Sequence, residues 1–99
     1  MNARIQIDRS KIADFCRRWN VEQLSLFGSV LREDFRADSD VDVLVRFGSD
    51  AHIGLIGFSR MEDELSELLG WKVDLVTVGG LKALIRDSVL AEAEVLYAA

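Results

Sequence analysis

Short apolar runs alternate along the chain with segments in which apolar residues recur at helical spacing. The apolar runs at 21–27, 41–47 and 73–78 predict strands, and a short extended segment from Glu94 to Tyr97 predicts a fourth. The first of these runs reads as a buried strand that ends at Gly28. Strands that alternate with helices predict an α/β (α+β) fold.

Helical spacing predicts three helices beside these strands. Asp8 or Ser10 caps the first, and Gly70 ends the second. Ser59 and Glu62 form a capping box for the second helix, whose start is set at or before Ser59. The third runs from about residue 81, with an apolar stripe at Leu84, Ile85 and Val89. We expect a two-layer sandwich, in which helices cover mainly one face of a small mixed sheet of three or four strands.

The strand at 41–47 begins with two carboxylates, Asp40 and Asp42, set two residues apart. Side chains at positions i and i+2 of a strand point the same way, so both carboxylates share one face. The opposite face presents the apolar row Val41, Val43, Val45 and Phe47. Like charges at this distance repel unless a cation lies between them, and Mg²⁺ favours a few carboxylates together with substrate phosphates.

A Gly-Ser turn precedes this pair, with ten residues between Ser29 and Asp40. Gly28 allows a sharp turn and close approach to a ligand. If Ser29 opens a short helix as far as Phe35, its N–H and hydroxyl face a bound anion, and Arg32 adds a charged donor.

A third carboxylate, Asp74, lies within the very apolar strand at 73–78. Burial there is costly for an acid unless a proton donor, a base or a metal accompanies it. Each feature also has an ordinary structural interpretation: the Gly-Ser step as a turn, the aspartate pair as a solvated strand entry, and Asp74 as an ion-paired or edge residue.

The run GSVLREDFRADSDVDVLV, followed by a strand bearing VDLV, resembles the minimal nucleotidyltransferase (MNT) domain of the DNA polymerase β superfamily. The resemblance extends from about Val21 to the C-terminal VLY, and we treat residues 1–99 as one such domain. It implies transfer of a nucleoside monophosphate, usually from ATP, with two Mg²⁺ ions. Chains of this size resemble antitoxins of HEPN/MNT toxin-antitoxin pairs, which adenylylate a tyrosine of the HEPN toxin.

The resemblance also implies roles for individual residues. Gly28, Ser29 and Arg32 hold the triphosphate, Asp40 and Asp42 ligate both metals, and Asp74 ligates the metal nearer the acceptor and helps remove its proton. Glu33 departs from the family pattern, which commonly has glycine after the arginine. An acid there makes the phosphate role of Arg32 less secure.

Composition narrows the function classes. A net charge of -5 disfavours a nucleic-acid binder, and no stretch approaches the roughly 20 apolar residues of a membrane span. No secretory signal opens the chain, so we expect a cytoplasmic protein. The single cysteine, Cys16, is expected in the core, and His52 has no partner at metal-ligand spacing.

Three functions remain open on the sequence: an AMP transferase acting on a partner toxin, an antitoxin that neutralises by binding alone, and a nucleotidyltransferase for RNA or a small molecule. The glycine-rich connection from Gly48 to Gly57 is expected beside the site, where it admits substrate or is only a loop. The acceptor, base preference, number of AMP units and stoichiometry are left open.

Overall fold

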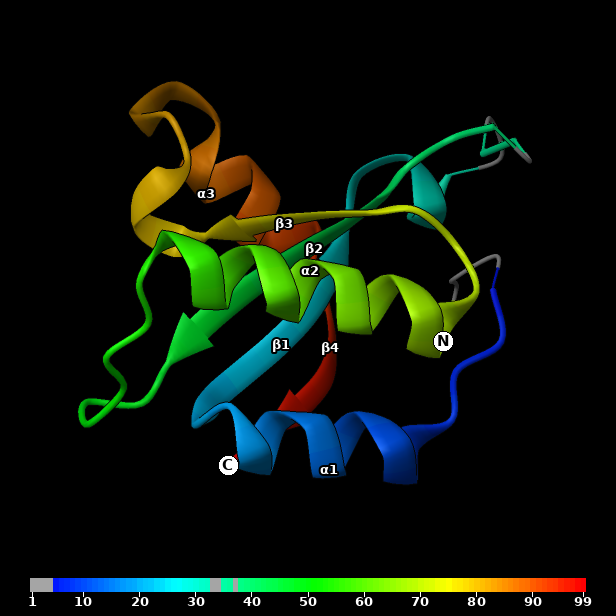
Figure 1. Cartoon of the computed structure of the whole chain (residues 1–99). Coiled ribbons are helices and arrows are strands. Elements are labelled where there is room, and N and C mark those ends of the chain that lie inside the picture. The colour runs from blue at the N-terminus through cyan, green and yellow to red at the C-terminus, as the bar shows by residue number, and fades with distance from the viewer. Residues whose placement is uncertain (1–4, 33–34, 37) are drawn as a thin grey trace.

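The structure is a computed structural model that describes residues 5–32, 35–36 and 38–99. Its elements follow one another in an order of alternating helices and strands (Figure 1). They are α1 (Arg9–Arg18), β1 (Val21–Phe27), the 3₁₀ turn η1 (Gly28–Leu31), β2 (Val41–Phe47), α2 (Leu55–Leu69), β3 (Val73–Thr77), the 3₁₀ turn η2 (Val78–Gly80), α3 (Ala83–Glu92) and β4 (Glu94–Ala98). No helix within these ranges is long and apolar enough to cross a membrane.

The four strands form one mixed sheet in the order β3-β2-β1-β4. β1 is antiparallel to both β2 and β4, whereas β2 and β3 are parallel. The parallel pair needs a crossover, and α2 supplies it. The prediction of a small mixed sheet in an α+β fold is confirmed, and the final extended segment is its fourth strand.

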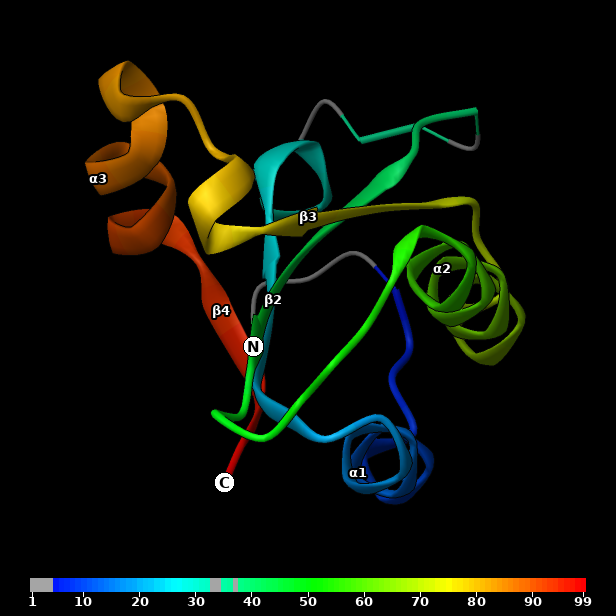
Figure 2. The ribbon, with the colours of Figure 1, turned by 60° about the vertical axis from the view of Figure 1, so that its left-hand side comes forward.

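Helices α1 and α2 lie on one face of the sheet, and α3 lies on the other side (Figure 2). The core fills the space between the sheet and the first two helices. Its fully buried members come from both layers and include Ile12, Phe15, Cys16, Leu24, Leu26, Val41, Val43, Val45, Met61 and Leu65. We call this the covered face and the opposite one the open face. Cys16 lies in the core as predicted, and burial raises the pKa of its thiol to about 12.

Side-chain hydrogen bonds fix the two helices. The Asp8 carboxylate accepts hydrogen bonds from the N–H groups of Ser10 and Lys11, so Asp8 caps α1 as predicted. Trp19 Nε1 of the α1 C-cap donates to Glu64 of α2 over 3.2 Å, which links the helices. α2 ends at Gly70 in the left-handed conformation, as predicted.

The capping box predicted at Ser59 and Glu62 is wrong, whereas a start of α2 before Ser59 agrees with the sequence. The helix begins at Leu55 after Gly54, so Ser59 lies inside it and caps nothing. Glu62 instead accepts a hydrogen bond from the N–H of Leu75 over 2.8 Å, and Ser66 Oγ accepts one from Val73 over 3.1 Å. Two outward N–H groups on the free edge of β3 are thereby paired, which protects that edge from pairing with another strand.

The third helix is present, but its predicted apolar stripe is not part of the core. α3 begins at Ala83 and has no buried residue. Leu84 is 98% exposed, because α3 lies away from the covered face where the core is formed.

Candidate active site

Three strand ends bring the predicted acidic residues together. In the parallel register of β2 and β3, Asp42 lies directly opposite Asp74, and in the antiparallel register of β1 and β2 it lies opposite Phe27. Asp40 comes just before β2. Because Val41 and Val43 point into the core, Asp42 points to the open face, and so does Asp74 between Val73 and Leu75.

Gly28 lies against the carboxylate of Asp42. Its φ is +75°, and a Cβ atom at this position would lie 2.3 Å from Asp42 Oδ2. Such a distance is shorter than any van der Waals contact, so the side chain of Asp42 occupies the space that a larger residue would need. Glycine is therefore required here both by the backbone conformation and by the neighbouring carboxylate.

The electrostatics of Asp42 reflect its crowded position. Burial raises the pKa of this carboxyl, and the charges of Asp74 and then Asp40 raise it further, while Arg32 lowers it. All four side chains therefore lie within electrostatic reach of one another around Asp42. Asp42 therefore loses its proton less readily than an isolated aspartate, and nearby positive charge opposes this effect.

This donor set fits a divalent cation. Hard cations such as Mg²⁺ take carboxylate oxygens, and a cation between these groups would relieve the repulsion that Asp42 experiences. Among the described residues, no three His, Cys, Asp or Glu side chains are gathered tightly enough to hold a metal ion as they stand. Asp40, Asp42 and Asp74 are neighbours, and metal binding would require rotation of their side chains.

Ser29 lies directly beside this cluster, at the start of η1. The predicted short helix from Ser29 to Phe35 is wrong: the turn ends at Leu31, and Arg32 N–H donates to Ser29 C=O over 2.9 Å. Phe35 instead packs on Trp71 with ring centroids 4.8 Å apart. Phe35 is thus anchored beside the start of β3, since a packed aromatic pair contributes more than its buried area alone. Glu33 lies outside the described residues.

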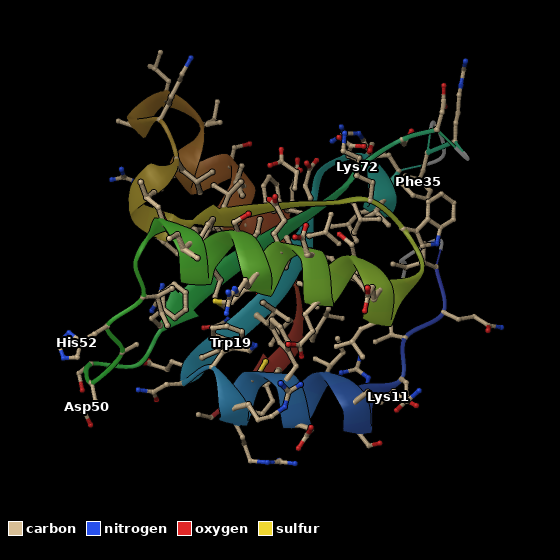
Figure 3. All side chains as sticks on the ribbon, viewed as in Figure 1. Lys11, Trp19, Phe35, Asp50, His52 and Lys72 are labelled. Atoms are coloured by element: carbon tan, nitrogen blue, oxygen red, sulfur yellow. The ribbon has the colours of Figure 1, made fainter. Side chains whose placement is uncertain are left out.

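Lys72 is a neighbour of the site that the sequence reasoning missed. Its carbonyl accepts a hydrogen bond from Val41 N–H over 2.8 Å, which continues the β2–β3 pairing and places Lys72 opposite Asp40. It lies two residues before Asp74 and therefore shares the open face with it. Figure 3 shows Lys72 and Phe35 at the same end of the molecule. The WKVD spacing was the available signal, because a cation two residues before an acid on a strand lies beside it.

The glycine-rich connection does not lie beside this cluster. It follows Phe47 at the far end of β2, whereas Asp40 precedes the strand. Asp50 and His52 accordingly lie at the opposite end of the molecule from Lys72 (Figure 3). The expectation that this loop adjoins the site is wrong.

Comparison with known proteins agrees with this geometry. The model of the nucleotidyltransferase domain family matches residues 9–96. The protein adenylyltransferase MntA of Thermococcus cleftensis is 41% identical over 75 residues, or 76% of this chain and 74% of the relative. The chain belongs to the nucleotidyltransferase domain family. It is a nucleotidyltransferase, and the resemblance drawn from the GS and DxD elements is confirmed.

Solved structures share its fold. A protein classed as a minimal nucleotidyltransferase has a TM-score of 0.72 and 37% identity, with 87% of this chain and 86% of that chain covered. A structure of the tri-AMPylated Shewanella oneidensis HEPN toxin in complex with MNT antitoxin contains a chain with a TM-score of 0.65 and 22% identity. That match covers 92% of this chain and 70% of the other, and it shows likeness of fold.

Proposed function

We propose that this protein transfers AMP from ATP, with two Mg²⁺ ions, to a tyrosine hydroxyl of a HEPN-family toxin and thereby acts as its antitoxin. The observation that carries the proposal is the position of Asp42 between Gly28 on one side and Asp74 on the other, on the open face. The adenylyltransferase name of the Thermococcus cleftensis relative and the AMPylated toxin in the Shewanella oneidensis complex support the choice of reaction and partner.

The position of each residue in the site determines its proposed role. The backbone of Gly28 and the N–H and hydroxyl of Ser29 bind the β- and γ-phosphates, and Arg32 adds positive charge near Asp42. Asp40 and Asp42 would hold both metal ions, and Asp74 would help to hold one of them. Magnesium, when bound, neutralises the phosphate charge and stabilises the attacking and leaving oxygens of an in-line displacement.

The reaction itself asks little covalent work of the protein. The tyrosine oxygen forms a bond to the α-phosphorus as the bond to the pyrophosphate oxygen breaks, and pyrophosphate leaves. Asp74 accepts the phenolic proton, since it lies on the side of Asp42 away from Gly28 and thus on the acceptor side. Lys72, opposite Asp40, offsets part of the charge that the carboxylates and the nucleotide bring together.

Intact-mass spectrometry tests this proposal. A HEPN-family toxin is incubated with this protein, ATP and Mg²⁺, in parallel with the Asp40→Ala/Asp42→Ala variant. We expect a mass gain of one or more AMP units with the parent protein. The variant should form the same complex but transfer at least about 10³-fold more slowly, as removal of a preorganised charge-stabilising group commonly does.

Three other results would count against the proposal. A stable complex without any mass gain would indicate neutralisation by binding alone. Retained transfer by the double variant would show that these carboxylates are not the site. Retention of labelled tRNA on a filter at low salt would favour an RNA substrate instead, against the net charge of -5.

A further inference from the structure

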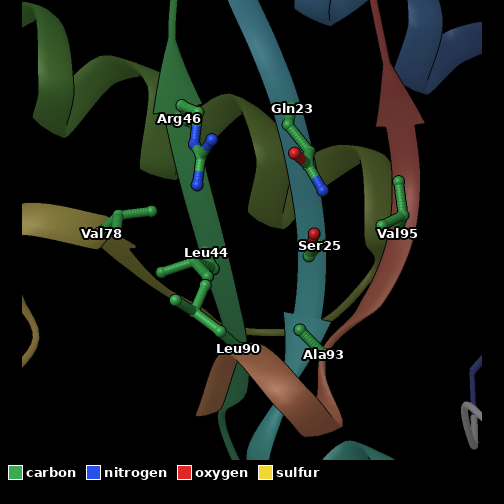
Figure 4. Close-up of a pocket in the computed structure, with 8 residues that line it drawn as sticks. All are labelled: Gln23, Ser25, Leu44, Arg46, Val78, Leu90, Ala93 and Val95. Atoms are coloured by element: carbon green, nitrogen blue, oxygen red, sulfur yellow. The ribbon is translucent and has the colours of Figure 1, made fainter. Parts of the chain in front are cut away.

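A pocket opens on the open face of the sheet, beside the carboxylate cluster (Figure 4). Its polar lining comes from β1 and β2, namely Gln23, Ser25 and Arg46. Its apolar lining includes Leu44 of β2, Leu90 of α3 and Val95 of β4. We call this the open-face pocket. In the strand predicted over 21–27, Gln23 and Ser25 face this pocket, while Leu24 and Leu26 are buried in the core.

Ser25 is an unusual lining residue. It is 3% exposed, and among the described residues it is the one polar side chain classed as buried. Its hydroxyl forms no hydrogen bond with any described residue, nor do the side chains of Gln23 and Arg46. A ligand group that reaches this hydroxyl can donate a hydrogen bond to it or accept one from it.

The position of the pocket relative to Asp42 indicates what part of a nucleotide reaches it. Gly28, Asp42 and Asp74 follow one another across the sheet. In the proposed function the leaving oxygen lies on the Gly28 side of Asp42 and the attacking oxygen on the Asp74 side, so the line between the two oxygens runs across the strands. The nucleoside is attached to the α-phosphorus at right angles to this line. Along β2, the next residue on the open face after Asp42 is Leu44, about 7 Å away, and it lines the pocket.

The lining matches the chemistry of a purine edge. A glutamine amide and a serine hydroxyl each donate and accept, as the ring nitrogens and exocyclic amine of adenine require, and glutamine can bind adenine in a bidentate manner. Arg46 can stack on the ring face, and Leu44, Leu90 and Val95 offer an apolar wall. The enclosed volume is about 60 Å³, so the edge of the ring enters rather than the whole base.

We propose that the open-face pocket binds the edge of the nucleobase of ATP, and that Gln23 and Ser25 select the base. The inference rests on the proposed function for the placement of the triphosphate. It adds a site for the base and names two residues that determine specificity.

Equilibrium binding measurements without the toxin separate this inference from the transfer reaction. Affinities for ATP, GTP, CTP and UTP, each with Mg²⁺, are compared for the parent, Ser25→Ala and Gln23→Leu. Ser59→Ala and Gln6→Leu are matched controls, because both residues are exposed and lie outside the pocket. We expect each pocket variant to bind ATP about three- to tenfold more weakly, as loss of one hydrogen bond predicts, and to distinguish ATP from GTP less well.

Unchanged ATP affinity and base preference in both variants, with melting temperatures like those of the controls, would overturn the inference. It would equally fail if the parent bound no nucleoside triphosphate. ATP binding that depends on Ser25 and Gln23, without transfer to the toxin, would support the pocket while refuting the proposed function.

Discussion

The two faces of the sheet use the same strands for opposite purposes. On the covered face, Leu24, Val43 and Val45 are fully buried against α1 and α2. On the open face, the alternate positions of these strands carry Ser25, Asp42 and other polar side chains. Because side chains alternate along a strand, each strand supplies the core and the chemistry at once.

The two faces therefore make different contributions, one to stability and the other to function. The covered face buries apolar area and stabilises the fold. The open face holds three carboxylates, and burial of Asp42, together with the charges of Asp74 and Asp40, raises the pKa of Asp42, so its ionised form opposes folding. A chain of 99 residues has a modest core, so the covered face must offset the cost of the site.

The largest effect on stability is expected from the covered face. Leu24→Ala removes a fully buried side chain and leaves a cavity, at a cost of about 2–5 kcal/mol. The melting temperature should fall by about 10 °C or more. Transfer by the molecules that remain folded at low temperature should be unchanged, since Leu24 points away from the carboxylates. Val95→Ala, at a residue that lines the open-face pocket and is 44% exposed, is the control and should cost far less.

Equal losses in the two variants would mean that the faces do not differ in their contribution to stability. Scanning calorimetry of both proteins at one pH decides this.

Gly28→Ala should affect both properties, because this residue joins the backbone to the site. An L-residue at φ +75° costs about 1–2 kcal/mol, and the new Cβ would displace the Asp42 carboxylate. Gly70→Ala is a close control: its φ is +72°, and nothing lies within 4 Å of the added Cβ. We expect both variants to lose stability and only Gly28→Ala to lose transfer, as measured by melting curves and AMP incorporation. Transfer at the wild-type rate by Gly28→Ala would show that a Cβ at position 28 does not displace the Asp42 carboxylate.

Asp42→Asn should raise stability while abolishing transfer. The amide removes a negative charge from a repulsive group, and like charges opposite one another in a sheet cost about 0.2–1 kcal/mol. Melting temperatures in metal-free buffer, compared with those of the exposed loop variant Asp50→Asn, measure the gain. A loss of stability would show that the carboxylate has a favourable partner.

The gain should depend on pH with a definite sign. The pKa of Asp42 is higher in the folded than in the unfolded protein, so the wild type loses stability as pH rises through the folded pKa. Below the ordinary value of 3.8, Asp42 is protonated in both states and the advantage of Asn should vanish. A gain that stays constant across this range would point to a cause other than charge.

Much of this architecture follows from local rules. The spacing of Asp40 and Asp42 predicted that both side chains lie on one face of the strand. The apolar runs at 41–47 and 73–78 predicted two strands of the sheet that places Asp74 beside them. The left-handed end of α2 at Gly70 and the cap at Asp8 depend on residues close in sequence, and both were predicted correctly.

The errors arose where distant contacts decide. Glu62 and Ser59 match a capping box, but Glu62 binds the edge of β3 and the helix starts earlier. The run 21–27 contains Gln23 and Ser25 between apolar residues, and only the position of the helices shows which side is covered. The glycine-rich loop follows β2, whereas Asp40 precedes it, so the two lie at opposite ends of the strand. The wrong prediction came from not following the direction of the chain along β2.

The smallest effect is expected on α3, which lies on the side of the open face and took no part in the core. Leu84→Gln changes a side chain that is 98% exposed, so the free energy of unfolding should shift by no more than about 0.5 kcal/mol. Leu65→Gln is the comparison, because Leu65 is fully buried in α2 and its replacement would bury an unpaired amide. Urea denaturation of both variants makes the contrast measurable. A loss in Leu84→Gln similar to that in Leu65→Gln would place α3 in the core and remove the distinction between the two faces.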